Sequence, residues 1–181
     1  GDGSDIWGWT DVEYQREYAI FCCYYGTSFV DVTVGDRPNV LGFLPTTNGV
    51  GSDWRDAKVY EDHVYIVSEE VGHGMQVFDL RRLRELDGED IVDLEPDYLY
   101  KGPLSLGSVH NIVINEDSGF AYAVGSNTCN SGLHMIDIRD PLKPEFVGCF
   151  GEDGYVHDAQ CVIYDGPDTR YHDQEICFCF N

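Results

Sequence analysis

The sequence has no long apolar run, few basic residues and none of the common short catalytic motifs. No apolar stretch approaches the roughly 18 residues of a membrane-spanning helix. It contains no phosphate-binding glycine loop, no Gly-x-Ser-x-Gly sequence and no His-Glu-x-x-His sequence. The 11 Lys and Arg residues face 33 Asp and Glu residues, and the net charge of −22 repels nucleic acid phosphates. We therefore expect neither a nucleic acid partner nor a transmembrane segment.

The composition is that of a turn-rich globular protein. The hydrophobic fraction is 43% and there are 20 glycines, which argues against a disordered chain. The acidic residues are spread along the sequence instead of forming a tail. This pattern suits a solvated surface, a salty medium or cation binding, and composition alone does not choose among them.

The cysteines are not spaced as in a zinc ribbon, because no Cys-x-x-Cys pair occurs. The seven are Cys22, Cys23, Cys129, Cys149, Cys161, Cys177 and Cys179. Disulfides are the favoured interpretation, with one cysteine left over, and buried free thiols are the alternative. We predict the pairs Cys129–Cys149 and Cys161–Cys177 as bridges across neighbouring strands. Disulfides would place the protein in an oxidising compartment, outside the cytosol.

One short motif occurs three times and is the most informative feature of the chain. It spans residues 26–32, 74–80 and 132–138, and its aspartates recur at intervals of 48 and 58 residues. Each copy has a glycine, four mostly apolar residues, an aspartate, and a β-branched residue or leucine. A repeat of this length indicates an array of small sheets. The repeated aspartates are expected to bond backbone N–H groups at turns, a structural role and not a catalytic one.

Short segments with a period of two surround each copy, and turn residues separate them. Four antiparallel strands per unit predict an all-β fold, a β-propeller with about three and a half blades. The expected blades cover residues 4–45, 53–104, 108–151 and 155–181, as one partial domain. Residues 81–86 predict one short helical insertion. A β-sandwich is the structural alternative, although it does not explain the repeat. So few blades leave open edges, which further blades or another chain would close.

Four phrases of the sequence resemble the LVIVD-repeat proteins, and more narrowly the bacterial choice-of-anchor B family. They are residues 26–33, 72–80, 110–115 and 157–162. The resemblance implies a β-propeller exported to the cell surface or beyond it. It implies no reaction, and some relatives accompany subtilisin-like proteases as regulatory regions.

Polar residues open the innermost strand of each unit, and alignment of the units places Asp5, Asp56, Asn111 and Asp158 at one position. Innermost strands of a propeller run beside its axis, so these side chains are expected to converge. Such an oxygen-rich ring suits Ca²⁺. His110 and His157 precede two of these residues and would favour zinc or another transition metal if both rings faced one point. Alternatively, each Asp or Asn bonds nearby backbone at a strand end.

Two further residue types carry expectations. Trp7, Trp9 and Trp54 lie near the openings of the first two units, where core packing is more common for tryptophan than sugar stacking. His73 lies between two glycines and is expected in an exposed turn.

The sequence favours a secreted or cell-surface module that binds a protein or a glycan and performs no catalysis. The alternatives are a metal-dependent hydrolase with its ion at the axial ring, and a regulatory domain associated with a subtilisin-like protease.

Overall fold

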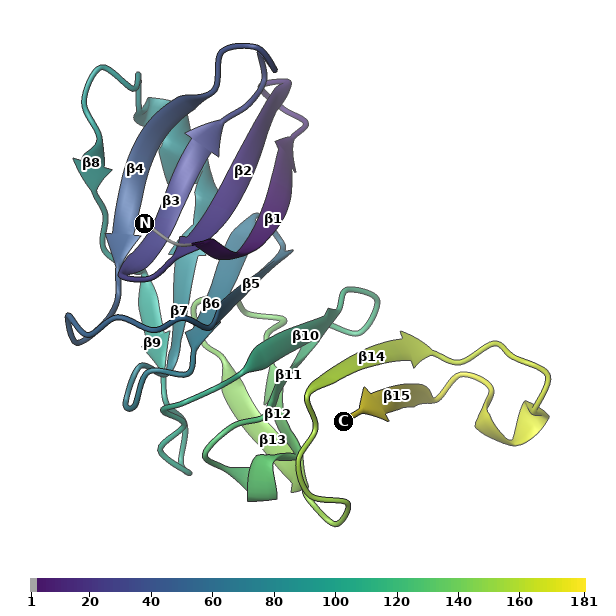
Figure 1. Ribbon diagram of the computed structural model, residues 1–181. Coiled ribbons are helices and arrows are strands. Elements are labelled where there is room, and N and C mark those ends of the chain that lie inside the picture. Colours follow the sequence, from purple (N-terminus) through teal and green to yellow (C-terminus); the bar gives the residue numbers. More distant parts are fainter. Residues whose placement is uncertain (1–2) are drawn as a thin grey trace.

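The computed structural model describes residues 3–181, and these form an all-β protein with four sheets (Figure 1). The first sheet contains β1 (Gly3–Asp11), β2 (Arg16–Cys23), β3 (Gly26–Asp31), β4 (Asn39–Pro45) and β8 (Val92–Asp93). The second contains β5 (Arg55–Tyr60), β6 (His63–Ser68), β7 (Met75–Asp79) and β9 (Tyr98–Tyr100). The third contains β10 (Asn111–Asn115), β11 (Phe120–Val124), β12 (Leu133–Asp137) and β13 (Glu145–Phe150). The fourth contains β14 (Asp158–Ile163) and β15 (Glu175–Phe180).

The all-β class and the four-stranded antiparallel sheets are confirmed. Neighbouring strands within each sheet are antiparallel, apart from the pair β4 and β8. The predicted helical insertion is the 3₁₀ helix η1 (Leu80–Glu85). Two further 3₁₀ turns, η2 (Cys129–Ser131) and η3 (Thr169–Tyr171), were not predicted.

One pairing crosses the predicted unit boundaries. The short strand β8 follows η1 in the chain, yet it pairs in parallel with β4 of the first sheet. The backbone N–H of Leu94 then donates to the carbonyl of Phe43 at 2.8 Å. The segment after η1 is therefore an arm that holds the first two sheets together. The sequence did not predict this arm, because a strand of two residues is too short to show a periodic pattern.

The central sheets are covered on both faces. In β6, Val64 and Ile66 lie in the cluster shared with the first sheet, whereas Tyr65 and Val67 lie in the cluster shared with the third. All four are fully buried. Successive side chains of a strand point to opposite faces, so a strand between two sheets is apolar at every position. β11 of the third sheet behaves in the same way.

The first strand of each sheet lies against the first strand of the next. β1 is in contact with β5, β5 with β10, and β10 with β14, although tens of residues separate these strands in sequence (Figure 1). The starts of all four strands therefore meet in one region of the molecule.

The repeated aspartates make the predicted turn contacts. Oδ1 of Asp31, Asp79 and Asp137 accepts the backbone N–H two residues ahead, at 2.9, 3.0 and 3.0 Å respectively. This contact closes the turn that ends the third strand of each unit. The structural role predicted for these carboxylates is confirmed.

The glycine that opens each repeated motif is required by the neighbouring outer strand. A Cβ atom on Gly74 would lie 2.7 Å from the carbonyl oxygen of Tyr100, and Gly74 also has a φ of +78°. A Cβ atom on Gly26 or Gly132 would likewise collide with a carbonyl oxygen of the paired strand. The motif thus begins with glycine because the adjacent backbone approaches closely there.

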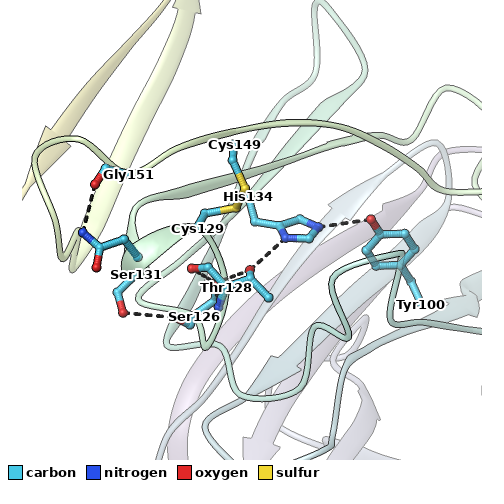
Figure 2. Close-up of a disulfide and its surroundings, with 9 residues drawn as sticks. Tyr100, Ser126, Thr128, Cys129, Ser131, His134, Cys149 and Gly151 are labelled. Carbon is cyan, nitrogen blue, oxygen red and sulfur yellow. Dashed lines mark hydrogen bonds between the residues drawn. A yellow bond between two sulfur atoms is a disulfide. The ribbon is translucent and has the colours of Figure 1, made fainter.

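Both predicted disulfides are present. Cys161 and Cys177 are opposite residues of β14 and β15, with Cα atoms 4.0 Å apart. Cys129 bonds Cys149, with Cα atoms 5.3 Å apart (Figure 2). Cys129 lies in the turn η2 and not on a strand, so this second bridge joins a turn to the outer strand β13.

The count of leftover cysteines was wrong. Three thiols are free instead of one: Cys22 is buried, Cys23 is half-buried and Cys179 is exposed. Cys22 and Cys23 follow one another in β2 and point to opposite faces of the strand, which keeps their sulfurs apart.

Candidate functional site

The four aligned polar residues meet in one groove. Asp5, Asp56, Asn111 and Asp158 line a groove of about 410 Å³ that runs along the starts of β1, β5, β10 and β14. We call these four residues the inner ring, and the depression the inner groove. Its walls also carry other polar or aromatic side chains from the same strands and the loop after β10: Trp7, Lys58, Glu116 and Gln160. The alignment of the repeat therefore predicted which residues come together.

The inner ring ties each sheet to the next through backbone groups. Oδ2 of Asp5 accepts the N–H of Ala57 at 3.4 Å, and Oδ2 of Asp56 accepts the N–H of Ile112 at 2.8 Å. The two contacts occupy equivalent positions of the repeat. In each, the carboxylate accepts from the residue that follows the ring member of the next sheet.

The other two ring members also bond backbone. Asn111 donates its side-chain N–H to the carbonyl of His157 at 2.9 Å, and Oδ1 of Asp158 accepts the N–H of Ala159 at 2.8 Å. These bonds favour the alternative in which the ring residues bond backbone at strand ends. Sequence reasoning did not foresee that three of the bonds would run between sheets.

Asp56 is the electrostatic centre of the groove. Its Oδ1 lies 2.6 Å from Nζ of Lys58. Burial is the largest influence and raises the pKa of Asp56 to about 6, although the Lys58 ammonium acts in the opposite direction. The same ammonium lies 4.5 Å from the ring centroid of Trp7. Lys58 was missed in the sequence, although a residue two positions after Asp56 on a strand shares its face.

The residues before the ring members form a second cluster at the rim of the groove. Nε2 of His110 lies 2.9 Å from Nε2 of His157, so the two rings do face one point. Nδ1 of His110 lies 2.7 Å from Oε1 of Glu69. Glu69 follows β6 and is 41 residues from His110, and nothing in the linear sequence linked them.

The remaining members of the aligned pairs are structural. Ser4 donates from Oγ to the carbonyl of Arg55 at 3.0 Å. Arg55 is buried; its Nε donates to the carbonyl of Cys23 at 3.2 Å, and its Nη1 lies 2.8 Å from Nε2 of His73.

The expectation that His73 is exposed was wrong. Its side chain is fully buried, and Nδ1 lies 2.9 Å from the carbonyl oxygen of Gly74. Burial, reinforced by the nearby Arg55 guanidinium, lowers the pKa of His73 to about 4. His73 is therefore a neutral hydrogen-bonding residue of the core, not a free ligand.

His134 has the same character in the third sheet, and sequence reasoning did not single it out. Figure 2 shows its ring between Tyr100 and Thr128, whose hydroxyls lie 3.1 and 2.8 Å from its two nitrogens. Burial lowers the pKa of His134 to about 4. The Cys129–Cys149 disulfide lies beside this network and follows Thr128 directly.

The three tryptophans have different environments. Trp9 is buried, stacks on Tyr18 at a centroid distance of 5.0 Å and donates to Oδ1 of Asp62. Trp7, at the inner groove, and Trp54, near His110, are 39% and 56% exposed. Core packing thus accounts for only one of the three.

The described part of the chain lacks two features that bear on the predictions. Residues 3–181 contain no cluster of three or more His, Cys, Asp or Glu side chains arranged to hold a metal ion. The same residues include no helix with the length and apolar character needed to cross a membrane.

Comparison with known proteins gives no family. No protein-family model matches the chain, and no curated protein matches it significantly.

Proposed function

We propose that this chain is a β-propeller module of the LVIVD-repeat type, exported from the cytosol, which binds a protein or glycan ligand at its inner groove without catalysis. The observation that carries the proposal is the inner groove itself, since the starts of four repeated units build it together.

The radial arrangement is supported by three features. The first strands of successive sheets are neighbours, the second and third sheets are covered on both faces, and equivalent ring residues make equivalent bonds to the next sheet. A sandwich has two stacked layers, whereas here each sheet follows the previous one through its first strand.

The groove has the size and lining of a small ligand site. Its volume of about 410 Å³ lies within the roughly 300–1,000 Å³ typical of such sites. It offers a partly exposed indole from Trp7 and polar side chains such as Gln160 and Asn111. An aromatic ring beside hydrogen-bonding groups suits a sugar ring or a peptide side chain.

The charge of the groove restricts the class of ligand that can bind there. Four carboxylates line it (Asp5, Asp56, Glu116 and Asp158) against the one ammonium of Lys58. An anionic ligand would meet repulsion there, so the proposed ligand is a neutral or cationic glycan or a basic peptide segment.

Glycan and peptide arrays probed with the wild-type protein test this proposal. We expect binding to neutral or cationic probes. Trp7→Ala should lose affinity by roughly thirtyfold, since removal of a central aromatic side chain from a binding site costs about 2 kcal/mol. Tyr98→Ala is the matched control, because Tyr98 is 38% exposed but lies on the outer strand β9. Equal binding by the wild type and Trp7→Ala would contradict the groove as the binding site.

Export from the cytosol rests on the disulfides. Two bridges in one chain are typical of proteins that fold in oxidising compartments. Attachment to a cell surface is part of the proposal through the family resemblance alone.

The hydrolase alternative is less well supported. The ring oxygens that would bind an ion already accept backbone N–H groups, and Asp56 also pairs with Lys58. Calcium at the ring, a regulatory role beside a protease, and an association that closes the open edges all stay predictions.

A further inference from the structure

We propose that His110 and His157 bind one transition-metal ion through their Nε2 atoms, with Glu69 as the carboxylate that orients His110. We call the two residues the histidine pair. This site adjoins the inner ring, and the proposal does not depend on which ligand the inner groove binds.

The fold fixes the histidine pair in place. His110 and His157 directly precede β10 and β14, and their backbone N–H groups donate to the carbonyls of Val124 and Phe180 at 3.2 and 2.7 Å. The bond from Asn111 to the carbonyl of His157 joins the two strand starts. Both rings are therefore carried by paired strands, and their centroids lie 4.4 Å apart.

Glu69 fixes the tautomer of His110. Nδ1 of His110 lies 2.7 Å from Oε1 of Glu69, and a carboxylate can only accept, so Nδ1 carries the proton. In the neutral ring, Nε2 then accepts the hydrogen bond that Nε2–H of His157 donates. An ion that binds both Nε2 atoms therefore displaces this proton of His157, to its Nδ1 or to solvent. A carboxylate behind the distal nitrogen is the usual support of a metal-binding histidine.

The spacing suits two adjacent ligands of one ion. Nitrogen atoms 2.9 Å apart can each bind one ion at roughly 2.0–2.1 Å if the angle between the two bonds is roughly 90°. That angle belongs to square-planar and tetragonal sites, which Cu²⁺ and Ni²⁺ prefer with nitrogen ligands. A tetrahedral Zn²⁺ site needs a wider angle, and hence a small separation of the rings.

The ion would have open positions. The histidine pair borders a cavity of about 180 Å³ that also includes Asp5, Trp54 and Asn111. Two protein nitrogens leave other positions for water or for a donor atom of an incoming molecule.

The other four histidines do not offer such a site. His63, His73 and His134 are buried, and each has a ring nitrogen within hydrogen-bond distance of a partner. His172 is exposed, and its Nε2 lies 2.7 Å from the carbonyl oxygen of Gly166. His172 is therefore a suitable control.

Calorimetric titration of the chelator-treated protein with Ni²⁺ and Zn²⁺ tests the proposal, with excess Mg²⁺ present to occupy weak carboxylate sites. We expect one equivalent to bind, and Ni²⁺ more tightly than Zn²⁺ because of the angle. His110→Ala and His157→Ala should abolish this binding, Glu69→Gln should weaken it by roughly tenfold or more, and His172→Ala should leave it unchanged.

Cu²⁺ gives a second readout once the free thiols are alkylated. The paramagnetic resonance spectrum should show coupling to two imidazole nitrogens, and Cu²⁺ should quench Trp54, whose ring centroid is 5.9 Å from that of His110. His157→Gln keeps a side chain of similar length if the alanine variant does not fold. Binding that survives both histidine substitutions, or no binding by the wild type, would overturn the proposal and leave the 2.9 Å contact as a plain hydrogen bond.

Discussion

The interface between the first two sheets and the interface between the last two differ in the size of their apolar clusters. The first is rich in large side chains: Trp9 and Tyr18 stack within it, and Phe29 and Phe78 stack across it with ring centroids 5.0 Å apart. The last is smaller, and Ala159 and Cys161 supply much of its contribution from the fourth sheet.

Both disulfides lie in the carboxyl-terminal half of the chain, one in the third sheet and one in the fourth. Cys161 is a member of its core cluster, and its partner Cys177 packs against that cluster. Cys129 precedes β12 of the third sheet. Apolar burial stabilises in proportion to area, and disulfides stabilise where that area is small. The amino-terminal sheets therefore depend on packing alone, whereas the third and fourth sheets each carry a covalent link within themselves.

Matched leucine truncations should give the largest difference between the two interfaces. Leu44 is fully buried at the first interface, and Leu133 is 5% exposed at the last. Leu44→Ala should lower the free energy of unfolding by about 4 kcal/mol, and Leu133→Ala by about 2 kcal/mol, because the smaller cluster leaves a smaller cavity. Urea unfolding followed by circular dichroism measures both values. An equal or larger cost at Leu133 would contradict the comparison.

Loss of the Cys161–Cys177 bridge should act mainly on the fourth sheet. The two residues are 16 apart in sequence, and a loop of that length is worth about 3 kcal/mol in the chain-entropy account. The double variant Cys161→Ser, Cys177→Ser should therefore lose about 2–3 kcal/mol and exchange amide hydrogens faster in β14 and β15 than in β2 and β6.

Cys179→Ser is the matched control for that experiment, since Cys179 is a free and exposed thiol on β15. It should leave both stability and exchange unchanged. Faster exchange spread evenly over all four sheets in the double variant would show that the bridge does not act locally.

Much of the fold could be predicted because its units repeat. The motif with Asp31, Asp79 and Asp137 marked the third strand of three sheets, and the period of two marked the strands around it. The arm with β8 could not be predicted, because two residues carry no periodicity and its partner β4 is distant in sequence.

The candidate site was predictable where its residues repeat from unit to unit, and not where they occur in one unit only. Alignment of the units brought the inner ring and the histidine pair together, since equivalent positions of equivalent strands converge. Lys58 and Glu69 belong to a single unit each and have no repeated counterpart that would signal them. His73 was misjudged because its flanking glycines indicated an exposed turn, whereas the contact with Arg55 is a tertiary feature.

The smallest expected effect is on the pH dependence of stability. It concerns one buried histidine of the second sheet and one of the third. Burial lowers the pKa of His73, bonded to Arg55 of the second sheet, and of His134, in the third sheet, to about 4. In the unfolded chain both titrate near 6.5, so between these values the unfolded state binds protons that the folded state does not. Stability is therefore lost as the pH falls from about 6.5 toward 4, by about 2 kcal/mol for each residue at pH 5.

Asp56 has the opposite effect on the pH dependence of stability, because its pKa is raised in the folded protein. Its protonated carboxyl favours the folded state, and this stabilisation is lost as the pH rises through about 6. The Asp56 contribution cancels when each histidine variant is compared with the wild type, since all of these proteins contain Asp56. Urea unfolding at pH 5 and pH 7 should show a smaller drop in stability for His73→Gln and for His134→Gln than for the wild type. Because both histidines are fully buried and neutral, the two variants should relieve the drop equally, in contrast to the leucine pair. If either variant lost as much stability between pH 7 and pH 5 as the wild type does, the histidine it replaces would be protonated in the folded protein at pH 5. Burial would then not keep that histidine neutral.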